Sequence, residues 1–167
     1  MRKIYILIAL ALLISLFIYL FYRTEKTLVT EVFIRLISIN NYRKLKAGVL
    51  QMLPLSDIVV YSLPEALWVF CITLTSRTYY FEFYKRRIEC LYIPLLFCVG
   101  LELLQLVHIT NGRFDFMDIG LSAVFWILGR YILPGKAEKH NLITRPNLKM
   151  MVCLASYGIV YLAHVFK

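Results

Sequence analysis

Five apolar runs, each close in length to a membrane span, constrain this chain more than any other feature of its sequence. A helix needs about 20 mainly apolar residues to cross the ~30 Å hydrocarbon core of a bilayer. Hydrophobic residues make up 60% of the chain and charged residues only 17%, a composition typical of an integral membrane protein. The sequence therefore predicts an all-α fold, a multi-pass transmembrane helical bundle of about five membrane helices that forms a single membrane domain over residues 1–167. The predicted spans are 4–22, 57–76, 88–109, 116–133 and 148–166.

The segment 24–56 is more polar than the runs around it, and it is expected to lie on the membrane rather than in it. Leu28, Val32 and Leu36 recur at helical spacing, while Glu31 and Arg35 lie four apart on another face. This pattern predicts one amphipathic interfacial helix. Such a helix serves either as a lid or docking element for a membrane protein partner, or as a tether at the lipid headgroups.

The net charge of +9 is carried by short basic clusters beside the apolar runs, at 43–46, 85–87 and 136–149. That placement favours anionic lipid headgroups as partners and argues against nucleic acid, for which no motif is present. The first run follows Arg2 and Lys3 but is too long for a signal peptide, so it is expected to remain as an anchor. Counting Lys and Arg on each side favours a cytoplasmic N-terminus. The four cysteines lie in or beside apolar runs and are expected to be buried thiols.

Polar side chains interrupt the third and fourth runs. A carboxylate within a membrane helix costs at least ~2.5 kcal/mol, so it is by default a functional-site hypothesis. The short turn at 110–112 predicts an antiparallel helical hairpin, which would bring the polar side chains of both runs together on the outer face. The predicted pocket comprises Glu102, Gln105, Arg113, Asp115, Asp118 and Ser122.

Ordinary helix-end chemistry explains part of this cluster. Asp115 is a favourable N-cap, and Asp118 complements the dipole of the following helix. It does not explain Glu102, which lies roughly two turns below the turn and must be protonated, paired or hydrated, with Arg113 as its natural partner. Glu65 either joins the same pocket or is a first-turn acid of its own helix, which Pro64 is expected to break or kink near its start.

Three kinds of chemistry suit these residues. Glu102, Asp115 and Asp118 are hard oxygen ligands for a divalent cation, Mg²⁺ or Ca²⁺, which would bridge to a lipid phosphate. Arg113 could instead bind phosphate directly through its planar guanidinium. The same three acids, Glu102, Asp115 and Asp118, are also the catalytic candidates, with Glu102 and one aspartate working as general acid and base. No spacing chooses among these alternatives, so whether the protein is an enzyme stays open.

The ordered string Glu102-x-x-Gln105 and Arg113-Phe-Asp115-x-x-Asp118, followed by a glycine-containing apolar helix, resembles the core signature of the VanZ-like family of small bacterial membrane proteins over about residues 99–129. Ser122 stands where that family usually has asparagine. The resemblance implies a multi-pass protein of the bacterial inner (cytoplasmic) membrane, part of the cell envelope, and a member of the family is linked to glycopeptide antibiotic resistance.

Three functions are therefore expected as alternatives. The first is recognition of a lipid or glycolipid headgroup by the six pocket residues. The second is a membrane enzyme acting on a lipid phosphate or glycan. The third is an accessory subunit of an envelope membrane complex, in which the segment 24–56 docks the partner.

Overall fold

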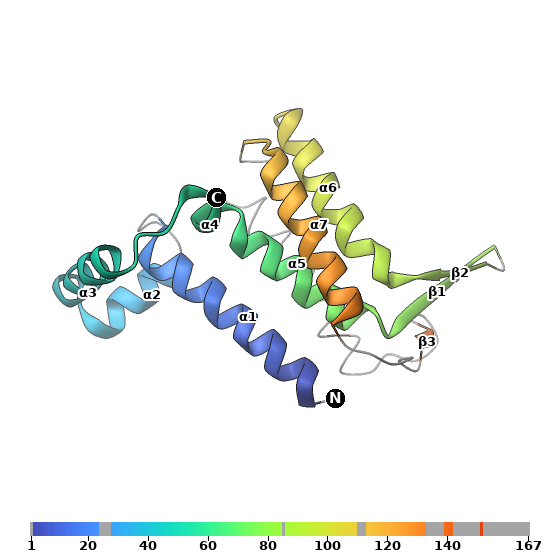
Figure 1. Cartoon of the computed structure of the whole chain (residues 1–167), viewed down its shortest axis with the longest axis horizontal. Coiled ribbons are helices and arrows are strands. Elements are labelled where there is room, and N and C mark those ends of the chain that lie inside the picture. Colours follow the sequence, from blue (N-terminus) through green and yellow to red (C-terminus); the bar gives the residue numbers. More distant parts are fainter. Residues whose placement is uncertain are drawn as a thin grey trace. The chain divides into compact units, whose positions relative to one another are not determined.

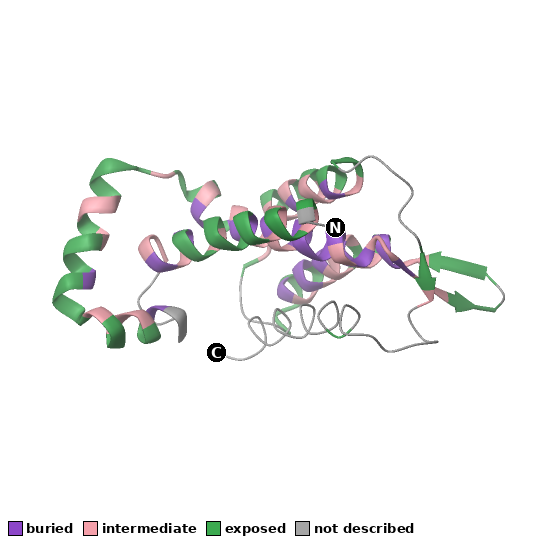
Figure 2. Cartoon of the chain, turned by 90° about the horizontal axis from the view of Figure 1, so that it is seen from below, coloured by how far each residue is buried: buried purple, intermediate pink, exposed green. Residues whose placement is uncertain are grey.

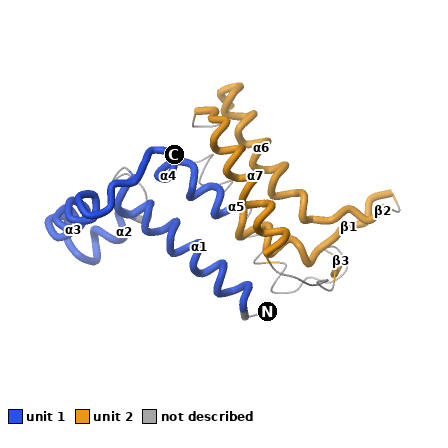
Figure 3. The backbone as a smooth tube through the Cα atoms, in the orientation of Figure 1, with its two compact units in different colours: residues 1–68 blue, residues 69–167 orange. Residues whose placement is uncertain are grey.

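The computed structural model describes residues 2–23, 28–84, 86–109, 113–132, 139–141 and 151. By its internal contacts the chain divides into two compact units, Met1–Trp68 and Val69–Lys167 (Figure 3). The division falls inside one helix, α5 (Leu63–Ser76), between Trp68 and Val69.

Unit 1 contains the longest helix, α1 (Arg2–Phe21), followed by α2 (Leu28–Ile37), α3 (Ile39–Met52) and the short α4 (Asp57–Tyr61) (Figure 1). Two polar contacts, one buried and one partly buried, connect the end of α1 to α3. The hydroxyl of Tyr42, a fully buried side chain of α3, donates to the carbonyl of Leu20 at 2.7 Å, and Lys46 Nζ donates to the carbonyl of Arg23 at 3.0 Å. These bonds satisfy carbonyls that the end of a helix leaves without intrahelical partners.

The expected interfacial helix at 24–56 is two helices. The chain breaks at Ser38, where φ is 69°, a left-handed conformation that an α-helix does not continue through. Glu31 and Arg35 are both exposed, and most of α3 is exposed as well (Figure 2). The prediction of helical structure is confirmed, the prediction of a single helix is wrong, and the position at a membrane surface stays a prediction.

Unit 2 contains the rest of α5, a single 3-10 turn η1 (Cys90–Tyr92), and the helices α6 (Ile93–Leu106) and α7 (Phe116–Tyr131). It also contains a sheet of three strands in the order β2-β1-β3. The strand β1 (Tyr79–Phe83) pairs antiparallel with β2 (Arg86–Glu89), with Tyr80 opposite Glu89, and parallel with β3 (His140–Asn141), with Tyr79 opposite His140.

Close approach and aromatic packing hold the helices of unit 2 together. A Cβ added at Gly129 of α7 would lie 3.0 Å from Thr73 Cγ2 of α5, so a larger residue there requires Thr73 to shift by a few tenths of an ångström. Phe70 and Phe125 pack edge to face with their ring centroids 6.2 Å apart. The indole of Trp126 on α7 donates to the carbonyl of Leu91, just before α6, at 2.8 Å.

The predicted multi-pass bundle is wrong. Only Lys3–Phe21, among the described residues, is long and apolar enough to cross a membrane. The predicted span 57–76 breaks at Ser62, two residues before Pro64, as expected near a proline, and α5 has only 14 residues. The α6 helix of 14 residues and the α7 helix of 16 are about 21 and 24 Å long, shorter than a ~30 Å hydrocarbon core. The predicted span 148–166 lies outside the described residues except for Met151.

The all-α prediction is also wrong, because Tyr79–Phe83 and Arg86–Glu89 form a pair of antiparallel strands. From the sequence alone, the aromatic residues before Lys85-Arg86-Arg87 predict an aromatic belt at a membrane interface followed by a basic loop; these aromatic residues are Tyr79, Tyr80, Phe81, Phe83 and Tyr84. Aromatic residues favour strands as strongly as interfaces, and the strand that follows them carries the basic residues. An ion pair between Arg87 Nε and Glu82 Oε1 at 3.3 Å joins the two strands across one register position.

The expectation of buried thiols is confirmed for Cys71, Cys90 and Cys98, while Cys153 lies outside the described residues. Burial in α5 raises the pKa of the Cys71 thiol to about 12.

Candidate functional site

The site lies where α6 ends and α7 begins. The α6 helix stops at Leu106, three residues before the end of the predicted span, because His108 takes a left-handed conformation with φ 59°. The backbone N–H of His108 donates to the carbonyl of Gln105 at 3.0 Å, and that of Ile109 to the carbonyl of Leu104 at 2.9 Å. This pair of bonds is the Schellman motif that closes many helices. His108 therefore ends the helix, a position that more often carries glycine.

Asp115 is the N-cap of α7, as helix-end chemistry predicts. Its Oδ1 accepts the backbone N–H of Met117 at 2.8 Å. Its own backbone N–H donates to Oε2 of Glu102 at 3.0 Å. In a capping box, the side chain at the third helical position would accept that N–H, and here the third position is Asp118. Here Glu102, on the neighbouring helix, accepts that N–H instead, so the carboxylate of Asp118 takes no part in the cap.

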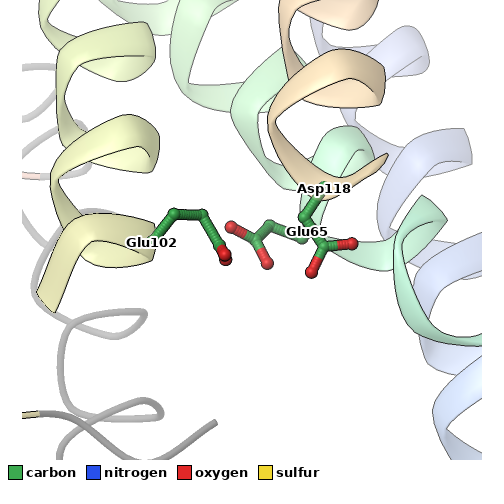
Figure 4. A group of neighbouring side chains, drawn as sticks. All are labelled: Glu65, Glu102 and Asp118. Carbon is green, nitrogen blue, oxygen red and sulfur yellow. The ribbon is translucent and has the colours of Figure 1, made fainter. Parts of the chain in front are cut away.

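Glu102 and Asp118 bring their carboxylates together across the two helices. Glu102 is fully buried, and one of its oxygens lies within 4.8 Å of an Asp118 oxygen (Figure 4). The Oδ1 atom of Asp118 is buried and has no hydrogen-bond partner among the residues that the structure describes. Glu65, which Figure 4 also labels, is a first-turn acid of α5 and belongs to unit 1.

Ser122 carries a further buried oxygen, one helical turn after Asp118. It follows Asp118 by four residues, on the same face of α7, and its side chain is fully buried. Because the Cα–Cβ bond of a helical residue tilts toward the helix N-terminus, the hydroxyl of Ser122 leans over the turn that carries Asp118. Within the described part of the chain its Oγ has no hydrogen-bond partner. Glu102, Asp118 and Ser122 are called the hairpin site from here on.

The two carboxylates repel each other strongly when both are ionised. At a separation of 4.8 Å and an effective dielectric constant of ~20, two unit charges interact with at least about 3 kcal/mol. The N-terminus of α7 offers about half of one positive charge, too little to neutralise both. Arg113, the predicted partner of Glu102, is exposed and forms no ion pair or hydrogen bond with any described residue. That predicted pairing is wrong, because the backbone N–H of Asp115 is bound to Glu102 instead.

The structure thus gathers some of the predicted pocket residues and separates others. Glu102, Asp118 and Ser122 lie together, and Gln105 is buried one turn further along α6 than Glu102. The side chain of Asp115 is exposed and engaged in its cap, so of the three candidate metal ligands only Glu102 and Asp118 are brought together. Sequence reasoning did not identify the backbone N–H of Asp115 as the hydrogen-bond partner of Glu102. The one available signal was an aspartate at the third helical position, one methylene shorter than the Glu or Gln of a capping box.

Comparisons with protein-family models, with curated proteins and with solved structures gave no match. The likeness of residues 99–129 to the VanZ-like signature therefore stays a resemblance.

Proposed function

We propose that this protein recognises the headgroup of a membrane lipid through the hairpin site and that α1 holds it at the membrane. The observation that carries the proposal is the close approach of two carboxylates: that of Glu102 near the end of α6, fully buried and fixed by a backbone hydrogen bond, and that of Asp118 in the first turn of α7. Two carboxylates held this close repel each other when both are ionised, so a ligand that binds both accounts for their arrangement. Their oxygens suit the hydroxyl or amine donors of a headgroup directly, and a phosphate only through a cation.

Exposed apolar side chains surround the end of the hairpin that carries the site. Val107 is 61% exposed, Ile109 71% and Phe116 78%. A cluster of large apolar side chains beside a polar site suits insertion into the headgroup layer, with the apolar tip in the lipid and the acids facing headgroups. This is contact with one leaflet and requires no helix of unit 2 to span the bilayer.

The end of α1 supports attachment to a membrane. The guanidinium of Arg23 lies 4.9 Å from the ring centroid of Tyr19 and 5.3 Å from that of Tyr61, and it donates to the carbonyl of Tyr61 at 2.8 Å. Tyrosine and arginine at the end of an apolar helix are typical of the membrane–water interface. The exposed face of α3 adds Arg43 and Lys44, which suit anionic lipids. The VanZ-like resemblance favours the bacterial inner membrane and an envelope lipid.

Native mass spectrometry of the detergent-extracted protein tests the proposal. We expect the wild type to retain one class of lipid and Glu102→Gln to lose it, because the variant keeps an acceptor for the Asp115 N–H but removes the charge. Glu82→Gln is the matched control, since it removes one exposed carboxylate of the same unit, 47% exposed and paired with Arg87. Retention of the same lipids by all three proteins, or of none by the wild type, would overturn the proposal.

An enzyme acting on a lipid phosphate or glycan is the second candidate, and the short separation of the two carboxylates favours it. Carboxyl groups about 5–5.5 Å apart serve as acid and nucleophile in retaining glycosidases. Incubation of the retained lipid with wild-type protein, followed by mass spectrometry of the lipid, distinguishes binding from turnover. An unchanged lipid mass after prolonged incubation would exclude this candidate for that lipid.

A further inference from the structure

We infer that the hairpin site binds a divalent cation of the Mg²⁺ type through Glu102, Asp118 and Ser122. The inference deepens the proposed function and rests on it only for the identity of the headgroup, whose phosphate would complete the coordination of the cation. Two buried oxygen atoms point to a ligand, and that of Ser122 does so independently of the two acids. The buried Oδ1 of Asp118 and the buried Oγ of Ser122 both have unused acceptor capacity within the described residues.

The local charge favours a cation over any other ligand. Two ionised carboxylates and the N-terminus of α7 leave a net charge of about −1.5. Arg113 is exposed and unpaired among the described residues, so it does not offset this charge. A divalent ion neutralises it with one small ligand, whereas a neutral headgroup donor does not.

The donor set favours magnesium among the common ions. Its described members are oxygen donors from two carboxylates and one hydroxyl. Soft ions prefer thiolate or imidazole, and Ca²⁺ takes six to eight oxygen ligands. Mg²⁺ is usually held by one or two carboxylates, keeps several waters and takes its remaining ligands from substrate phosphates. The hairpin site supplies two carboxylates as protein ligands and leaves coordination positions of the ion for a phosphate.

The main alternative is one proton shared between the two carboxylates, which would also relieve their repulsion. The two explanations predict that the stability of the folded protein depends on different solution conditions. A bound cation makes the stability of the folded protein depend on the concentration of the free ion, because a ligand that binds only the folded state stabilises it. A shared proton makes stability depend on pH and not on Mg²⁺.

The test is Mg²⁺ titration of the full-length protein in lipid-free detergent after EDTA treatment, followed by isothermal calorimetry and thermal unfolding, with Mn²⁺ as a paramagnetic substitute. We expect saturable binding with a rise in melting temperature, and Asp118→Asn to weaken binding by at least about tenfold, as loss of a metal ligand does. Asp115→Asn is the matched control three residues away. Asparagine caps a helix as well as aspartate does, so this variant should bind Mg²⁺ within about twofold of wild type.

Absence of any Mg²⁺ effect in the wild type, or equal weakening by Asp115→Asn and Asp118→Asn, would overturn the inference. Should Asp118→Asn fail to fold, Ser122→Ala replaces it, and unchanged affinity in that variant would remove Ser122 from the site. Lipid retention by EDTA-treated wild type would refute the cation while leaving headgroup recognition intact. Mg²⁺ binding without lipid retention would refute the proposed function and leave the cation site.

Discussion

The helix α1 and the α6–α7 hairpin have similarly apolar sequences, but they differ in helix length and in whether they bury polar side chains. The α1 helix has 20 residues, about 30 Å, and it exposes large apolar side chains such as Leu13 and Ile6 along its length. The α6 and α7 helices are about 21 and 24 Å long, and they bury the polar side chains of Glu102 and Ser122. Composition predicts that all three are helices. Length separates the one that can cross a bilayer from the two that form a site.

The sharpest way to break this comparison is to put one charge into each kind of helix. Leu12 of α1 and Leu96 of α6 are both exposed, by 49% and 70%. An arginine near the centre of a spanning helix costs about 2.5–3.5 kcal/mol on insertion scales, whereas an arginine on an exposed helix surface costs little. We expect Leu12→Arg to shift the protein from the membrane fraction to the carbonate-extractable fraction, and Leu96→Arg to leave it in place. The opposite result would show that α6, and not α1, holds the protein in the bilayer.

The bond between Glu102 and the Asp115 N–H should be the next largest effect. Glu102→Leu leaves that backbone donor without its acceptor and should lower the free energy of unfolding by about 1–3 kcal/mol. Glu102→Gln keeps an amide oxygen as acceptor and removes one of two repelling charges, so in EDTA it should be at least as stable as wild type. Denaturant unfolding of both variants measures the difference. Equal destabilisation would mean that the charge, and not the hydrogen bond, holds the hairpin.

The contact between α5 and α7 comes third. Gly129→Ala places a Cβ 3.0 Å from Thr73 Cγ2, and overpacking of this kind costs about 1–3 kcal/mol, with the low end expected for a single methyl group. Gly120→Ala lies on the same helix with no heavy atom within 4 Å of the new Cβ, so it should stabilise α7 by up to about 1 kcal/mol through helix propensity alone. Thermal unfolding of both variants measures whether each substitution lowers or raises the stability of the protein. Two stabilising results would show that α5 and α7 do not approach closely at Gly129.

The sequence was sufficient for features that depend on local patterns. It predicted α1, the start of α7 after an aspartate N-cap, the break near Pro64 and the burial of Cys71, Cys90 and Cys98. It could not separate an aromatic belt from the strand Tyr79–Phe83, because both use the same residue types. Nor could it predict that His108 would end α6, since a left-handed residue other than glycine is uncommon.

The site was predicted only in part, because residue types do not reveal the hydrogen-bond partner of Glu102. Side-chain spacing on one helix face placed Glu102 with the start of the next helix and put Ser122 beside Asp118. The partner of Glu102 is a backbone N–H, and every residue except proline carries one, so no residue type marks it. The strong charge of Arg113 made it the obvious partner from sequence, but its side chain lies in solvent.

The smallest expected effect concerns the thiol of Cys71 and tests whether α5 is packed in protein and not in lipid. Burial raises the thiol pKa from 9.0 to about 12, so the folded state holds the proton more tightly than the unfolded state does. The contribution to stability is complete below pH 9 and is lost as the pH rises from 9 toward 12, because the unfolded thiol ionises first. Between pH 8 and pH 10 the free energy of unfolding of the wild type should therefore fall by about 1 kcal/mol more than that of Cys71→Ala. A helix embedded in lipid in both the folded and the unfolded state would keep its thiol away from solvent hydroxide, and the two proteins would then lose stability in parallel.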